Sequence, residues 1–260
     1  MPFKNIIFDK EGAIALIVIN RPEVLNALNT QTFRELNEAL DQIENDTSIG
    51  GVLIRGAGDK AFVAGADIAE IQNLSYDSGK IFSGFGQRVF DRLENLDKPV
   101  IALIKGFALG GGCELAMACH IRLATENSRL GQPEVNLGLL PGYGATQRLP
   151  RLVGMGRALE LLLSAEMISA RRAYEIGLVN QIIPEDEIFD YGRQFLQKIL
   201  SKGPLAIKFI LQAVRHGFTH SFREGLDMEA ELFGKACASE DMKEGTTAFL
   251  QKRKPQFTGK

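Results

Sequence analysis

The segment PVIALIKGFALGGGCELA, residues 99–116, contains the pattern that decides the fold. Its first part, Pro99–Ile104, is a continuous apolar run of the kind found in strands covered on both faces of a sheet. The glycine-rich stretch Gly106–Gly112 follows at once, and Cys113–Cys119 has the composition of a buried helix. We therefore expect a strand, a tight turn and a helix, which together form the basic unit of an α/β fold.

The same alternation extends toward the amino terminus. Two apolar runs, Ile6–Phe8 and Ile14–Ile19, flank the turn residues Asp9–Gly12 and predict a β-hairpin. Thr32–Asn45 has a helical period, and Thr32 followed by Glu35 predicts a capping box. Further elements of the pattern are the strands Gly51–Arg55 and Ile121–Ala124 and a helix marked by Phe85, Val89 and Leu93.

After about Thr146 the strand signals thin out and helices dominate. Pro184–Glu187 predicts the start of a helix to Leu200, and Gly203-Pro204 marks an internal break. We expect an α/β core over residues 1–195 that holds the active site. A helical region over 196–260 should pack on the core and on neighbouring subunits. Its predicted helices are Pro204–Gly217, Ser221–Ala238 and Asp241–Phe249.

Composition and net charge exclude several classes of protein. The 260 residues are 45% hydrophobic, which excludes wholesale disorder, and a net charge of −2 argues against a dedicated nucleic-acid binder. The cysteines Cys113, Cys119 and Cys237 form no CxxC pair, so a disulfide framework is not expected. No apolar run approaches the ~20 residues of a membrane span, and the amino terminus does not read as a signal peptide. We expect a cytoplasmic protein with no membrane partner.

Two glutamates are candidate acid–base groups. Glu114 opens the apolar helix after the glycine turn, and Glu134 lies in Gly131-Gln-Pro-Glu134, ahead of another glycine-rich loop. Taken singly, Glu114 reads as an acid stabilised by a helix dipole and Glu134 as a solvated loop charge. Together, two acids beside glycine-lined turns suit proton shuttling.

Other polar features have simpler readings. Asp67 with Glu70 predicts a helix cap, and the neighbouring amide of Ala66 is free to donate. The glycine stretch 106–112 lacks the spacing of dinucleotide and P-loop sites, so it is either a tight turn or a place where a ligand approaches the backbone. His120 reads as a helix-end cap and the run 252–254 as a solvated basic face. His216 and His220 do not complete a metal motif, and no metal is expected.

Taken in order, several motifs resemble the crotonase (enoyl-CoA hydratase/isomerase) superfamily, closest to short-chain enoyl-CoA hydratase. The resemblance extends over essentially the whole chain. The motifs that carry it are NRPEVLNAL (20–28), AFVAGADI (61–68), GFALGGGCELA (106–116), GQPE (131–134), LLPGYG (139–144), KEG (243–245) and FLQKR (249–253).

The resemblance implies a spiral of repeated β-β-α turns with a helical carboxy-terminal trimerisation region, as a trimer or a dimer of trimers. It implies an acyl-CoA thioester substrate and no separate cofactor, because coenzyme A arrives with the substrate. Ala66 and Gly111 would form an oxyanion hole, with Glu114 and Glu134 as catalytic residues. The implied substrate and coenzyme contacts are Ala27, Ala64, Ala66, Asp67, Ile68, Ala69, Gly111, Gly142, Phe233 and Lys252.

Within the superfamily, glutamates at both catalytic positions favour a lyase of fatty-acid metabolism, an enoyl-CoA hydratase that adds water in syn fashion to trans-2-enoyl-CoA. A Δ3-Δ2 enoyl-CoA isomerase would need mainly Glu134. An RNA-binding relative would need a basic stripe that this chain lacks. Three positions depart from the common pattern: His120 stands where an acid is usual, Glu23 where a lysine is common, and Ala145 where a glycine is common.

Overall fold

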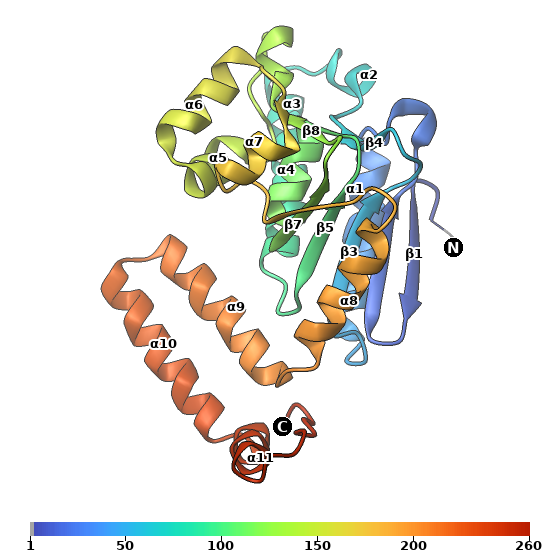
Figure 1. Ribbon diagram of the computed structural model, residues 1–260. Helices are drawn as coiled ribbons and strands as arrows, with labels where there is room; N and C mark the ends of the chain where they lie inside the picture. Colours follow the sequence, from blue (N-terminus) through green and yellow to red (C-terminus); the bar gives the residue numbers. More distant parts are fainter. Residues whose placement is uncertain (1–2) are drawn as a thin grey trace. The chain divides into compact units, whose positions relative to one another are not determined.

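The alternating segments form two sheets in the computed structural model, which describes residues 3–260 (Figure 1). Within this range one sheet has six strands in the order β1-β2-β3-β5-β7-β10, and the other has four in the order β4-β6-β8-β9. Only β1 and β9 run antiparallel to their neighbours among the described strands. The strands are β1 (Ile6–Glu11), β2 (Ile14–Ile19), β3 (Gly51–Gly56), β4 (Ala61–Ala64), β5 (Val100–Ile104), β6 (Phe107–Leu109), β7 (Ile121–Thr125), β8 (Arg129–Gly131), β9 (Ile168–Ser169) and β10 (Gln181–Ile183).

From β3 to β8, successive strands alternate between the two sheets. The chain passes from β3 to β4, from β5 to β6 and from β7 to β8, adding one parallel strand to each sheet at every turn. Helices α2 (Ile68–Ile71) and α3 (Tyr76–Glu94) follow β4, and α4 (Gly111–Ala118) follows β6. The expected α/β architecture of repeated β-β-α turns is confirmed.

The glycine stretch is more than the single tight turn predicted from the sequence, because strand β6 lies inside it. Gly106 has a φ of +69°, and a Cβ there would lie 2.0 Å from the carbonyl oxygen of Lys60. Only glycine allows both this backbone conformation and this approach. The bend at Gly106 carries the chain from the larger sheet to the smaller one, and the helix begins only at Gly111.

The amino-terminal hairpin is confirmed, although β1 continues to Glu11 and pairs through residues predicted as turn. Helix α1 (Thr30–Asn45) is also confirmed, but its predicted capping box is wrong. Asn29 is the N-cap, and its side-chain oxygen accepts from the backbone N–H of Thr32 at 2.8 Å. The Glu35 carboxylate instead accepts backbone N–H groups of Lys4, Asn5 and Ile6.

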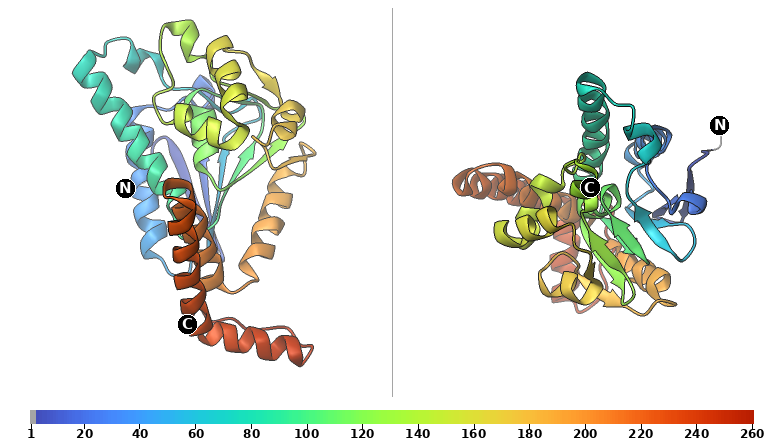
Figure 2. Two further views of the ribbon diagram at one scale, coloured as in Figure 1. Left: turned by 90° about the vertical axis from the view of Figure 1, so that its left-hand side faces the viewer. Right: turned by 90° about the horizontal axis from the view of Figure 1, so that it is seen from above.

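Helices α1 and α3 pack against each other (Figure 2). Arg92 on α3 joins them by donating to Asn37, Asp41 and Glu44 of α1. Three further helices precede the last strand: α5 (Ala145–Val153), α6 (Met155–Ser164) and α7 (Ala170–Glu175). The 3-10 helix η1 (Pro22–Val24) follows β2, and η2 (Pro133–Leu137) follows β8.

The chain divides into two compact units: Met1–Glu94 with Val100–Arg193, and Asn95–Pro99 with Gln194–Lys260. Helix α8 (Ile188–Leu200) begins four residues after Pro184, because residues 184–187 form a turn rather than the first helical turn. The second unit holds the antiparallel pair α9 (Pro204–Thr219) and α10 (Phe222–Cys237), followed by α11 (Glu240–Leu250) (Figure 1). No helix within residues 3–260 has the length and apolarity to cross a membrane.

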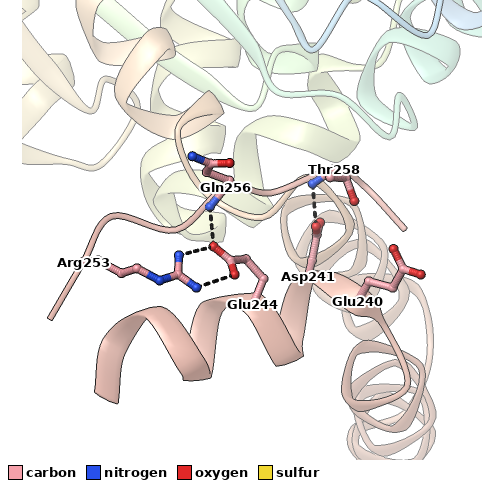
Figure 3. Close-up of a pocket in the computed structure, with 6 residues that line it drawn as sticks. All are labelled: Glu240, Asp241, Glu244, Arg253, Gln256 and Thr258. Carbon is pink, nitrogen blue, oxygen red and sulfur yellow. Dashed lines mark hydrogen bonds and ion pairs between the residues drawn. The ribbon is translucent and has the colours of Figure 1, made fainter. Parts of the chain in front are cut away.

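The carboxy-terminal segment is held against α11 by two acids (Figure 3). Asp241 accepts from the backbone N–H of Thr258 at 2.7 Å. Glu244 pairs with Arg253 at 2.6 Å and accepts the N–H of Gln256, and these bonds lower the pKa of Glu244 to about 2. The basic run 252–254 is exposed, as predicted, and within it Arg253 is ion-paired to Glu244.

The Glu35 contacts predict a pH-dependent contribution to stability. Burial opposes ionisation of Glu35, but hydrogen bonds from Gln31 and from three backbone amides outweigh it and hold its pKa below the ordinary value. Glu35→Ala should lower the free energy of unfolding by roughly 2–3 kcal/mol at pH 7, because buried amides lose their acceptor. A carboxyl with a lowered pKa stabilises the fold above its unfolded pKa, so the difference should shrink as the pH falls through the folded pKa.

The measurement is urea unfolding of both proteins at equal concentration between pH 3 and 7. Glu38→Ala is the matched control, because Glu38 is exposed on the same helix. An equal loss from both substitutions would contradict this role of Glu35.

Candidate functional site

Glu114 lies in the first part of α4 and is 1% exposed. Its Oε1 accepts two backbone hydrogen bonds, from the N–H of Tyr143 at 2.8 Å and from that of Ala145 at 2.9 Å. Both donors lie in the turn that leads into α5. Left-handed Gly144, with a φ of +114°, lies between them and orients both N–H groups toward one oxygen. The buried Glu114 carboxyl group is therefore held in place by two backbone N–H donors.

Glu134 approaches the same helix end from η2. A Cβ built on Gly110, the N-cap of α4, would lie 2.7 Å from its Oε1, and the φ of +50° at this position also favours glycine. With its amide nitrogen turned toward Glu134, buried Gln132 donates to both carboxylate oxygens at 3.1 Å. The two glutamates predicted as acid–base groups thus meet at the amino-terminal end of α4.

Burial governs the charge state of both acids. Desolvation, with a smaller contribution from the neighbouring Glu134, raises the pKa of Glu114 to about 7, although the two backbone donors and Arg148 act to lower it. Desolvation likewise raises the pKa of Glu134 to about 7. Groups with such pKa values can both take and give a proton near neutral pH. The pair therefore suits proton transfer rather than charge pairing.

Two backbone amides are available beside these acids. Ala66 forms a parallel bridge with Leu28, in which Leu28 bonds to Gly65 and Asp67. The N–H of Ala66 must therefore point away from Leu28. A Cβ on Gly111 would lie 3.6 Å from that Ala66 nitrogen, and Gly111 is the first residue of α4, whose initial N–H groups lack partners within the helix. The two amides form a small donor site next to the glutamates.

The segment 20–28 holds Ala66 in place. Asn26, buried with a φ of +61°, donates to the carbonyl oxygens of Ala57 and Ala61. Arg21 donates to the carbonyl of Ala27 at 2.6 Å and pairs with Asp67 at 2.9 Å. Asp67 also caps α2 as predicted, but Glu70 does not complete a capping box, since it accepts from Thr30 instead. Ala27 and Ala64 lie next to the bridge between Leu28 and Ala66.

The three consecutive glycines have different neighbours. Gly110 leaves room for Glu134, and a Cβ on Gly112 would lie 2.0 Å from the carbonyl oxygen of Val63. A Cβ on Gly111 would meet the Tyr143 ring at 3.2 Å. Tyr143 also stacks edge-on against Phe33, with ring centroids 4.9 Å apart. The role of the Tyr143 ring as a wall beside Gly111 was missed from the sequence, which gave no signal for it.

The remaining predicted residues are dispersed. Ile68 and Ala69 are exposed on α2, and Gly142 lies in the turn below Glu114, where its carbonyl accepts from Ser83 at 2.6 Å. Phe233 is 70% exposed on α10 in the second unit. Lys252 is exposed and left-handed, with a φ of +55°, at the end of α11.

Two further sequence readings are settled by these contacts. His120 contacts the end of a different helix: its Nδ1 accepts from the N–H of Val100, and its Nε2 lies 3.0 Å from the carbonyl oxygen of Glu94 at the end of α3. Ala145 serves in place of the common glycine, because it contacts Glu114 through its backbone N–H, which any residue except proline supplies. Within residues 3–260 no cluster of three or more metal-ligating side chains occurs.

The chain is similar over its whole length to known proteins. A model of the family described as enoyl-CoA hydratase/isomerase matches residues 9–260. The short-chain-enoyl-CoA hydratase of Clostridium acetobutylicum is 48% identical, covering 98% of this chain and 97% of the relative. The crotonyl-CoA hydratase of Syntrophomonas wolfei is 47% identical over 100% of both chains. The crystal structure of enoyl-CoA hydratase from Bacillus anthracis superposes with a TM-score of 0.95 at 37% identity, covering 99% of this chain and 100% of that one.

The raised pKa of Glu114 predicts a stability cost at neutral pH. An acid whose pKa rises on folding stabilises the fold below its unfolded pKa, and this contribution is lost as the pH rises toward 7. Glu114→Gln should therefore be more stable than the wild type at pH 8, by up to about 3 kcal/mol, and the difference should fade toward pH 5. Chemical unfolding across this range tests the prediction, with exposed Glu160→Gln as the control. A pH-independent difference would contradict it.

Proposed function

The chain belongs to the enoyl-CoA hydratase/isomerase family, and on that premise we propose that it adds water reversibly across the 2,3-double bond of trans-2-enoyl-CoA thioesters. The product is the 3-hydroxyacyl-CoA. The observation that carries this function is the meeting of buried Glu114 and partly buried Glu134, both with pKa values near 7, beside a pair of backbone donors. Two full-length relatives named as hydratases support the substrate class.

The amides of Ala66 and Gly111 form the oxyanion hole in this proposal. Attack at C3 shifts negative charge to the thioester oxygen, and donors fixed in advance stabilise that charge without reorganising. The amino-terminal end of α4 adds its dipole to the Gly111 amide. Both donors belong to backbone that is held by tertiary hydrogen bonds, so their positions do not depend on a flexible side chain.

The two glutamates divide the proton transfers. Glu114 positions the water and takes a proton from it as the water oxygen attacks C3. Both backbone donors bind Oε1 of Glu114, so its Oε2 can accept a hydrogen bond from the water. Glu134 delivers a proton to C2 as the enolate collapses, and the proton that Glu114 took from the water passes on to Glu134, which restores both acids. If one water held between them supplies both the hydroxyl group and the proton, both add to the same face of the double bond. A Δ3-Δ2 isomerase would need Glu134 alone, so the specific placement of Glu114 favours hydration.

Coenzyme A arrives as part of the substrate. Ala27, Ala64, Asp67, Ile68 and Ala69 border its arm in this proposal, since they flank the oxyanion donor Ala66 in sequence and in the Leu28 bridge. Gly142 lines the site below Glu114. Phe233 and Lys252, both exposed, contact the coenzyme bound by a neighbouring copy in a trimer or a dimer of trimers.

Replacing either glutamate by glutamine should remove proton transfer while keeping the side-chain shape. We expect kcat for crotonyl-CoA hydration to fall by ~10²–10⁴-fold in each single variant. Because both residues act on one water, the double variant should lose much less than the product of the single losses. Glu114→Gln should retain part of any isomerase side activity, whereas Glu134→Gln should lose it.

Loss of the enoyl absorbance gives the rates, and hydration in D₂O followed by NMR gives the stereochemistry. No loss of absorbance with any chain length would overturn the hydratase function. Anti addition, or fully multiplicative losses, would show that the two glutamates do not share a water.

The proposed role of Lys252 predicts a change in KM. Lys252→Asn removes the charge but suits the left-handed backbone, which asparagine adopts readily. We expect KM for crotonyl-CoA to rise about two- to fivefold with kcat nearly unchanged, the size of one exposed ion pair. Lys254→Asn is the matched control and should behave as the wild type. Equal KM values for the two variants would remove Lys252 from the coenzyme site.

A further inference from the structure

The turn that holds Glu114 is itself held from helix α3 by two routes. In the first, Ser83 Oγ and Gln87 Nε2 donate to the carbonyl oxygen of Gly142 at 2.6 and 2.9 Å. This carbonyl and the N–H of Tyr143 are the two ends of one peptide group. The same rigid plane is therefore fixed by α3 at its oxygen and by Glu114 at its nitrogen.

The second route passes through Arg148, whose side chain is only 10% exposed. Its Nη1 donates to the carbonyl of Tyr143 at 2.9 Å, the peptide group that lies between the two N–H donors to Glu114. The rest of the guanidinium is anchored on α3: Nη2 bonds to Asp91 at 2.6 Å and Nε to Glu94 at 2.8 Å. Planar arginine suits such a fork, because it can serve a carbonyl and two carboxylates at once.

Gly144 makes the approach of the guanidinium possible. A Cβ at this position would lie 2.3 Å from Arg148 Nη1. The left-handed glycine thus has two functions: it turns both N–H groups toward Glu114 and leaves space for the cation beneath them. Neither the resemblance nor the acid–base assignment gives Arg148 a role.

We propose that Arg148, braced by Asp91 and Glu94, is a positioning residue that fixes the Gly142–Ala145 turn and through it the catalytic orientation of Glu114. The proposal rests on the proposed function, because it needs Glu114 to act on the water. Arg148 does not touch the reacting atoms. It acts by keeping the two backbone donors aligned on one oxygen, so that the other oxygen stays directed at the water.

Arg148 also acts on Glu114 by charge. The charged or titratable groups beside Glu114 are Glu134 on η2, Arg148 on α5, Tyr143 in the turn and the neighbouring thiol Cys113, and behind the Arg148 guanidinium lie its partners Asp91 and Glu94 on α3. Of these only Arg148 is cationic, and it lowers the pKa of Glu114 against the effects of burial and of Glu134. Removing it should raise that pKa, so the base form of Glu114 should appear only at higher pH.

The test compares Arg148→Met, Arg148→Lys and the matched control Arg151→Gln in crotonyl-CoA hydration. Arg151 is exposed on the same helix and donates to the carbonyl of Gln147. We expect Arg148→Met to lose roughly 10- to 100-fold in kcat, the cost of a misplacement of about 1 Å, with little change in KM. The acid limb of its kcat profile should move to higher pH. Arg148→Lys should recover part of kcat and restore the limb, whereas Arg151→Gln should match the wild type.

A second variant tests whether the loss of kcat in Arg148→Met could come from misfolding alone. Asp91→Asn with Glu94→Gln keeps the cation but weakens its anchors, so it should lower kcat while leaving the acid limb near the wild-type position. Unchanged kcat in Arg148→Met, or a loss of kcat without any shift of the acid limb, would overturn the proposal. A wild type that does not hydrate crotonyl-CoA would instead overturn the proposed function, so the two failures are distinguishable.

Discussion

The burial of an ionisable carboxyl, that of Glu114 at the start of α4, is the constraint on which the candidate site depends. A carboxylate in such a place is costly unless backbone donors reach it, and the chain supplies two from a turn 29 to 31 residues away. To deliver them, the turn needs a left-handed glycine, and α3 must hold the carbonyls on its other side. Each turn of the β-β-α spiral adds a strand to both sheets, so segments that follow successive strands lie near one another.

Glu114 and Glu134 differ from Glu35 in how strongly their surroundings favour the charged carboxylate. Glu114 and Glu134 are kept half-neutral near pH 7 by burial, whereas Glu35, with four hydrogen bonds, is held ionised. The difference lies in how many donors each carboxylate receives for the water it has lost. Glu35 thus receives four donors, whereas Glu114 receives two, both on one oxygen.

Much of the fold followed from local pattern. The hairpin, the helices and the buried parallel strands could be predicted because apolar periodicity records which face of each element is covered. The sequence could not show β6, since three residues between glycines carry no period, or choose between Asn29 and Thr32 as the cap of α1. For the site, motifs indicated Glu114, Glu134, Ala66 and Gly111, whose roles stay predictions. Arg148 gave no signal, because its partners Asp91 and Glu94 lie 57 and 54 residues away in the chain.

The contact between Gly111 and the ring of Tyr143 has a consequence for how such a chain can drift during evolution. Gly111 has no left-handed backbone, so an alanine there is opposed only by an aromatic side chain, not by the main chain. Gly112, packed against a carbonyl oxygen, has no such freedom. Positions 111 and 143 should therefore covary: a smaller residue at 143 permits a larger one at 111, and each change opens or closes the space beside the same amide. The glycine run is one motif in the sequence but three separate constraints in the fold.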